Sequence, residues 1–145
     1  MSVKGLMTNP SETMTKSTAV MDACRVMHAE KAGALAVVED GKLCGIFTYR
    51  DLIDRVVLAK RDPEATTLAD VMTRDVEALA AGGSYGDALR LMVDKDYTYV
   101  PIVGDEARLE GMLSLRGLLE HRIDHLVSEL DSVTQYLYVD GPGGD

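Results

Sequence analysis

Two stretches of the chain place apolar residues at the spacing of an amphipathic α-helix. In each stretch four residues follow the order i, i+3, i+4, i+7, which puts them on one face of a helix. The first set is Val20, Ala23, Cys24 and Met27, and the second, 65 residues later, is Tyr85, Ala88, Leu89 and Met92. The pattern predicts two helices that each turn this face toward a core.

A short apolar run follows each predicted helix, at residues 34–38 and 100–103. Its length and β-branched content are typical of a buried strand. Second runs at residues 43–47 and 109–113 predict a partner strand in each half. Thr48 and Ser114 come directly after these runs, and both are good helix N-cap residues, so a second helix is expected to begin there.

The two halves of the chain therefore repeat one order of elements: strand, helix, strand, strand, helix. We predict an α+β fold of two repeats related by approximate twofold symmetry, each a small three-stranded sheet packed against two helices. The first repeat spans residues 6–60 and the second 68–125, followed by a helical extension at 126–139 and a flexible tail at 140–145. A half of this size buries too little apolar surface to be secure alone, so the halves should pack together and form clefts at their shared edge.

Composition excludes several classes of protein. The chain has 145 residues and a net charge of −9, without the clustered Lys and Arg that nucleic-acid binding requires. Its longest apolar runs are too short to cross a bilayer, and its start does not resemble a signal peptide. We expect a cytoplasmic protein that binds neither nucleic acid nor membranes. The two cysteines, Cys24 and Cys44, form no C-x-x-C pair and are expected to be core thiols.

Apolar residues continue along the last predicted helix beyond the length that its own repeat needs. They alternate at spacings of four and three residues and form what we call the C-terminal stripe: Leu119, Ile123, Leu126, Leu130, Val133 and Leu137. A stripe of this length indicates packing on a partner or across the other repeat. We expect a homodimer.

The segment from Gly45 to Asp51 concentrates the candidate chemistry. Thr48 begins a helix, so first-turn N–H groups and the positive end of the helix dipole favour a phosphate nearby. Arg50 adds a guanidinium that can bind a phosphate with two hydrogen bonds. Asp51 is an acceptor-only carboxylate suited to ribose hydroxyls. Thr48 and Asp51 also have the spacing of a simple helix-capping motif, and the two roles are compatible.

Three segments together resemble cystathionine-β-synthase (CBS) domains. Residues 45–51 resemble the ligand signature of the family, residues 68–73 the lead-in to a second repeat, and residues 99–103 the central strand with its proline. The resemblance runs from about Leu6 to Ile123. It implies a regulatory module, not an enzyme, that needs no cofactor and binds AMP, ADP, ATP or S-adenosylmethionine while acting on a separate, unknown protein. A ligand-free dimerisation scaffold on the same fold is the alternative.

The resemblance also implies which residues form two ligand sites. The site at Asp51 is expected to combine residues of both repeats: Thr48, Arg50, Asp51, Tyr97, Thr98 and Tyr99. The corresponding second site would use Thr18, Gly33, Ala34, Ser114 and Arg116. Gly117 stands there in place of the acidic residue, so we expect the second site to be weaker.

No pattern in the chain predicts a catalytic site or a metal site. His121 and His125 have the i, i+4 spacing of metal ligands, but no third ligand is evident. A solvated helix face is the interpretation that we prefer for this pair. No Ser–His–Asp or Cys–His arrangement is visible in the sequence.

Overall fold

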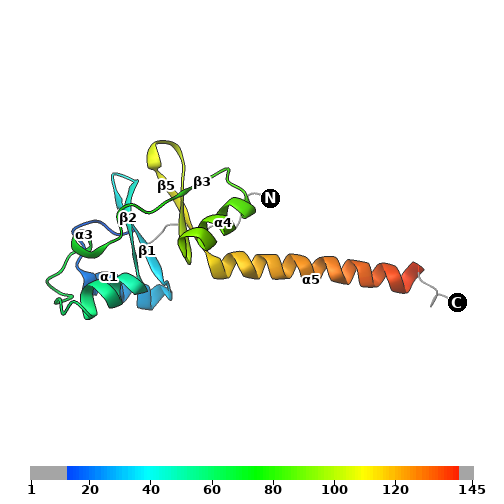
Figure 1. Ribbon diagram of the computed structural model, residues 1–145, viewed down its shortest axis with the longest axis horizontal. Helices are drawn as coiled ribbons and strands as arrows, with labels where there is room; N and C mark the ends of the chain where they lie inside the picture. Colours follow the sequence, from blue (N-terminus) through cyan, green and yellow to red (C-terminus); the bar gives the residue numbers. More distant parts are fainter. Residues whose placement is uncertain (1–12, 141–145) are drawn as a thin grey trace.

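A computed structural model describes residues 13–140 as two small α+β units from which one long helix extends (Figure 1). The helices are α1 (Val20–Glu30), α2 (Tyr49–Asp51), α3 (Leu68–Val71), α4 (Tyr85–Lys95) and α5 (Leu115–Asp140). The strands are β1 (Ala34–Glu39), β2 (Lys42–Thr48), β3 (Leu79–Ala80), β4 (Tyr99–Val103) and β5 (Leu109–Ser114). A π-helical segment, η1 (Leu52–Val57), continues α2, and a 3-10 turn, η2 (Asp105–Ala107), lies between β4 and β5.

The hairpin of β1 and β2 is the sheet of the first repeat. Its two strands run antiparallel and are joined at Asp40 and Gly41, whose φ angles are 53° and 78°. Positive φ at both residues is what a two-residue hairpin turn requires, and Asp-Gly is a favoured pair for it. The turn predicted from the sequence is therefore present.

Among residues 13–140, the third strand expected in the first repeat is present as a single bridge. Met14 pairs with Val37 alone, and its N–H donates to the Ala36 carbonyl at 3.0 Å. The next residues turn away because the Thr15 N–H and hydroxyl both bond the hydroxyl of Thr18, at 3.2 and 3.1 Å. Such local side-chain bonds compete with a β-ladder.

The second repeat has the predicted three-stranded sheet, in the order β3–β4–β5. Strand β5 runs antiparallel to β4 along its length, whereas the short β3 lies parallel to β4 and pairs only with Ile102 and Val103. Pro101, which has no N–H to donate, lies just outside that short pairing. A proline is therefore accommodated in a central strand.

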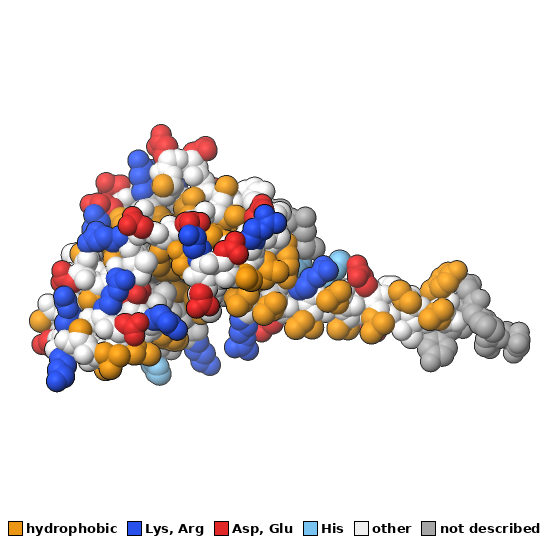
Figure 2. Space-filling view, viewed as in Figure 1, with side chains coloured by type: hydrophobic (Ala, Val, Ile, Leu, Met, Phe, Trp, Pro, Cys, Tyr) orange, Lys and Arg blue, Asp and Glu red, His pale blue; other side chains and the backbone are white. Residues whose placement is uncertain are grey.

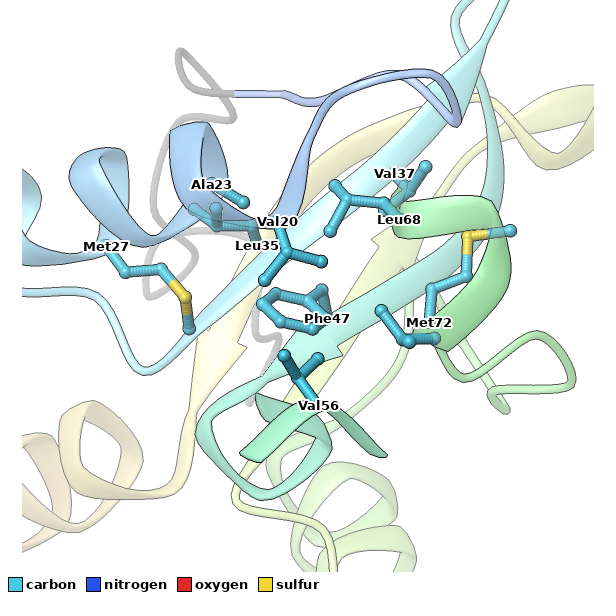
Figure 3. Close-up of a cluster of buried hydrophobic side chains, with 10 residues drawn as sticks. Val20, Ala23, Met27, Leu35, Val37, Phe47, Val56, Leu68 and Met72 are labelled. Carbon is cyan, nitrogen blue, oxygen red and sulfur yellow. The ribbon is translucent and has the colours of Figure 1, made fainter. Parts of the chain in front are cut away.

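The faces predicted for α1 and α4 are buried as expected. Val20, Ala23 and Met27 of α1 pack into one cluster around Phe47 (Figure 3), and Ala88 and Met92 of α4 pack into a second cluster around Val100, Ile102 and Leu113. Each repeat therefore has its own core.

Chain segments cross between the repeats. Leu68, Val71 and Met72 come from the beginning of the second repeat in sequence, yet they pack in the first cluster. Thr73 then pairs with Ile46 of β2 through two backbone hydrogen bonds of 2.9 Å. Residues 6–8, which the repeat aligns with 71–73, and the tail beyond Asp140 lie outside the described residues.

Helix α5 leaves the two cores after its first turns. Leu118 is fully buried and its carbonyl accepts a hydrogen bond of 3.2 Å from the Tyr85 hydroxyl, which fixes the helix to α4. Beyond that point α5 projects from the body (Figure 1), and apolar side chains follow one edge of it (Figure 2). The helix runs without a break through the predicted extension to Asp140.

Candidate functional site

A cleft of about 460 Å³ lies between the two repeats, and we call it the first cleft. All six residues expected at the Asp51 site line it, namely Thr48, Arg50, Asp51, Tyr97, Thr98 and Tyr99. The end of β2 and the start of α2 supply one wall, whereas the end of α4 and the start of β4 supply the other. The structure thus brings together two segments that lie almost 50 residues apart in sequence.

Thr48 and Asp51 form a complete capping box at the start of α2. The Asp51 N–H donates to the Thr48 hydroxyl oxygen at 3.2 Å, and the Thr48 N–H donates to Oδ2 of Asp51 at 3.0 Å. The arrangement satisfies two backbone donors at a helix start that would otherwise lack partners. The structural role that the spacing allowed is therefore realised.

The carboxylate of Asp51 is held from several directions. Only 6% of the residue is exposed. Oδ1 accepts a hydrogen bond of 3.0 Å from the Thr73 hydroxyl, and Nε of Arg55 lies 3.7 Å from the same atom. Oδ2 also lies 3.2 Å from the Thr48 hydroxyl. Because a carboxylate has about four lone-pair positions, these contacts leave room for about one further donor.

The first-turn N–H groups near Thr48 are largely engaged by the protein. The Tyr49 N–H donates to the Gly33 carbonyl at 3.1 Å, and the Asp51 N–H is used in the capping box. Binding of an anion in the first cleft would therefore depend more on side chains, and less on backbone N–H groups, than the sequence suggested. Arg50 is exposed at the edge of the cleft, where its guanidinium can reach such an anion.

The first cleft also contains residues that the sequence did not single out. Lys95 and Asp96, at the end of α4, line it next to Tyr97. Nζ of Lys95 lies 3.2 Å from Oε1 of Glu77, and this hydrogen bond raises the pKa of Lys95 above its ordinary value of 10.5. Lys95 lies two positions before Tyr97, the first residue predicted for this wall, so extending the wall backward by two residues would have included it.

Tyr99 fastens the second repeat to the first at the edge of the cleft. Its hydroxyl oxygen accepts a hydrogen bond of 3.1 Å from the N–H of Gly33, the residue before β1. A β-carbon at position 33 would lie 2.5 Å from that oxygen, so this contact requires glycine. Gly33 was expected in the second site, but it lines the first cleft.

The five residues expected at the second site do not share one of the described clefts, so that site stays a prediction. Ser114 and Arg116 line a separate hollow of about 370 Å³, which we call the α5 hollow, with Leu115, Leu119 and Ile123 of α5 and with Thr98 and Tyr99. Thr18 lies instead beside α3, where its carbonyl accepts the Leu68 N–H at 2.9 Å, and Ala34 is buried opposite Thr48 in the β1–β2 sheet.

The α5 hollow differs chemically from the first cleft. The Gly117 N–H donates to the Ser114 hydroxyl at 2.9 Å, so the helix cap exists without the acidic residue that Asp51 provides in the first repeat. Nε of Arg116 donates to Glu120 at 2.9 Å on the helix surface. The hollow therefore offers an apolar floor and a cation that is already paired.

Among residues 13–140, no cluster of three or more His, Cys, Asp or Glu side chains could hold a metal ion. His125 lies 3.1 Å from Glu129, one turn further along α5. Cys24 and Cys44 are free thiols, and burial raises the pKa of each above 9.0. None of the helices in this part of the chain is long and apolar enough to cross a membrane.

Comparison with known proteins assigns both repeats to one family. The CBS domain model matches residues 3–58 and again residues 68–124. The CBS domain-containing protein YhcV of Bacillus subtilis is 31% identical over 124 residues, which cover 86% of this chain and 87% of that protein. Other relatives are longer: the chain spans 18% of the meiotically up-regulated gene 70 protein of Schizosaccharomyces pombe, at 25% identity over 86% of this chain.

Solved structures show the same fold. A signal-transduction protein with CBS domains from Burkholderia ambifaria superimposes with a TM-score of 0.77 at 29% identity, over 86% of this chain and 95% of that one. The structure of CBSX2 in complex with AMP superimposes with a TM-score of 0.73 at 22% identity, over 85% and 96% of the two chains.

Two copies of one α+β unit, joined around a shared cleft, define the architecture. The chain belongs to the CBS-domain family and contains a tandem pair of CBS domains.

Proposed function

We propose that this CBS pair is a regulatory module that binds an adenosine-containing ligand in the first cleft. The observation that carries the proposal is the buried carboxylate of Asp51, which lies at the cleft between the two repeats beside Tyr97, Thr98 and Tyr99. The AMP bound to CBSX2, a protein of the same fold, supports this class of ligand. AMP, ADP, ATP and S-adenosylmethionine are the candidates.

The size of the first cleft suits such a ligand. Its volume of about 460 Å³ lies within the range of roughly 300–1,000 Å³ that is typical of small-molecule sites. The wall formed by Tyr97 and Tyr99 offers aromatic surface for a base, and the remaining acceptor capacity of Asp51 can take a ribose hydroxyl. Both ends of a nucleoside thus find a complementary surface.

Two cations make the outer part of the cleft suitable for the charged end of the ligand. Arg50 and Lys95 come from opposite walls and both line the cleft. A phosphate, or the carboxylate of S-adenosylmethionine, placed between them would form charge-assisted hydrogen bonds with both. Glu77 now pairs with Lys95, so a bound anion would compete with that carboxylate.

Binding in this cleft can be transmitted because its walls belong to different repeats. A ligand that contacts Asp51 and Tyr99 together stabilises the arrangement in which the repeats are closed on each other. We propose that a separate protein responds to this change, and we assign the chain no reaction and no required cofactor of its own. The α5 hollow, which lacks a counterpart of Asp51, is proposed to bind adenosine ligands more weakly or not at all.

Calorimetric titration with AMP, ADP, ATP and S-adenosylmethionine tests the proposal. We expect Asp51→Ala to lose tenfold or more in affinity, because a hydrogen bond to a charged group contributes about 1.5–3 kcal/mol. Asp54→Ala is the matched control, since it removes the same charge from an exposed position three residues later. Tyr97→Ala on the opposite wall should also weaken binding, and it leaves the capping box of α2 intact.

A ligand-free scaffold is the second candidate function, and the use of most of the acceptor capacity of Asp51 by protein donors favours it. In that case none of the four ligands would bind the parent protein at millimolar concentration. Equal affinity of the parent and Asp51→Ala would instead show that the ribose role proposed for Asp51 is wrong.

A further inference from the structure

The C-terminal stripe remains uncovered in the folded chain. Its six residues expose between 44% and 64% of their surface: Leu119, Ile123, Leu126, Leu130, Val133 and Leu137. Val127 and Tyr136 beside them are also more than half exposed. Single exposed apolar residues are ordinary, but soluble monomers rarely leave an apolar patch larger than a few hundred Å² exposed. A helix face of this kind fits a partner surface.

We propose that the C-terminal stripe packs antiparallel against the C-terminal stripe of a second copy of this chain, as a two-helix coiled coil. The alternating spacing of four and three residues is the heptad pattern whose two apolar positions form such a seam. The part of α5 beyond Leu118 projects away from both cores, so its stripe is accessible to a second helix along its length (Figures 1 and 2).

The charges beside the stripe determine the direction of pairing. Arg122 and Glu129 lie seven residues apart on one flank, whereas Val127 and Thr134 lie on the other. In a parallel pair opposite flanks meet, so Arg122 would face Val127 and Glu129 would face Thr134. In an antiparallel pair each flank meets its own counterpart, so Arg122 faces Glu129 of the partner subunit, and twofold symmetry repeats this pair.

The α5 hollow provides a place for the end of the partner helix. Leu119 and Ile123 belong both to the floor of this hollow and to the C-terminal stripe, so the two surfaces are continuous. In the antiparallel pair, Val133 and Leu137 of the partner subunit come to the hollow at the root of α5.

Sedimentation equilibrium of the full chain at tens of micromolar tests the pairing. We expect a dimer for the parent protein. Leu126→Glu together with Leu130→Glu should raise the dissociation constant about a hundredfold or more and give monomers. Ser128→Glu together with Gln135→Glu adds the same two charges to the outer face of α5 and should leave a dimer. A monomeric parent, or a dimer that survives the stripe variant, would overturn the proposal.

Charge reversal tests the direction. Arg122→Glu and Glu129→Arg should each weaken the dimer roughly fivefold, and the double variant should restore it. Residues seven apart on one helix do not touch, so restoration reports a contact between subunits. If the double variant is weaker than either single variant, the antiparallel direction is wrong. All of these positions are exposed on α5, so the variants are expected to fold, and unchanged circular dichroism is the check.

Discussion

The hydroxyl of Tyr99, in the second repeat, accepts a hydrogen bond of 3.1 Å from the backbone N–H of Gly33, in the first. The two residues lie 66 positions apart, and Tyr99 also lines both the first cleft and the α5 hollow. Tyr99 therefore connects the repeats where the ligand cleft and the root of α5 meet. A ligand that moves this side chain would affect the joint between the repeats, the first cleft and the root of α5.

Removing the Tyr99 hydroxyl should loosen the joint between the repeats. We expect Tyr99→Phe to lower the free energy of unfolding by about 0.5–1.5 kcal/mol, because the Gly33 N–H loses its partner in a partly buried place. Urea denaturation measures the change. Tyr136→Phe removes a hydroxyl from an exposed position on α5 and should change stability by less than about 0.5 kcal/mol. Equal effects of the two variants would show that the Gly33 contact contributes nothing.

Gly45 allows the crossing segment to approach β2. A β-carbon at this position would lie 2.7 Å from the Thr73 carbonyl oxygen and 2.9 Å from Sδ of Met72. Gly45→Ala should therefore separate Thr73 from Ile46 and cost about 1–3 kcal/mol in urea denaturation, as overpacking of a tight site does.

Gly82→Ala is the control for Gly45→Ala, because a β-carbon at position 82 has no atom within 4 Å. This change should be neutral or stabilise the protein by up to about 1 kcal/mol, through lower entropy of the unfolded chain. Similar losses at both positions would mean that steric crowding at Gly45 is not the cause.

The cap of α4 should make stability depend on pH in the acid range. Hydrogen bonds from the backbone and hydroxyl of Ser84 hold the pKa of Asp87 below its ordinary value of 3.8. A lowered pKa means that the ionised form stabilises the fold above pH 3.8, and that this contribution disappears as the pH falls through the lowered value. Asp87→Asn should therefore be less stable than the parent at pH 7 and equal to it near about pH 2.

Thermal unfolding at a series of pH values between about 2 and 7 measures this effect. Asp94→Asn removes the same charge near the other end of α4, away from the cap, and should not lower stability at pH 7, since an acidic residue is unfavourable near a helix C-terminus. A constant difference between the parent and Asp87→Asn across the whole pH range would contradict the role assigned to the carboxylate.

Patterns among neighbouring residues were sufficient to predict most of the helices, strands and turns. The periodicity of Val20, Ala23 and Met27 predicts α1 and its buried face, and Asp40-Gly41 predicts the hairpin turn. The spacing of Thr48 and Asp51 predicts the capping box. These features depend on residues within a few positions of each other, so the chain carries their full physical cause in one place.

The contacts within the first cleft join residues that lie far apart in the sequence, so no short sequence pattern predicts them. Thr73 bonds Asp51, and Gly33 joins Tyr99, only because the 68–73 segment packs on the first repeat and the two repeats close on each other. The second site stays a prediction, since Ser114 and Arg116 line the α5 hollow whereas Gly33 lines the first cleft.

The sequence by itself determined the helix caps and turns, because each follows from short-range order along the chain, and the recurrence of these local patterns revealed the repeated unit. Its resemblance to CBS domains indicated the family. The tertiary structure decided that hydrogen-bond donors from both repeats use most of the acceptor capacity of the Asp51 carboxylate. It also decided that Lys95 lines the first cleft and that α5 extends from the body with the C-terminal stripe exposed. Long-range packing places these groups, and the energy of a burial or a hydrogen bond is defined only once both partners are in position.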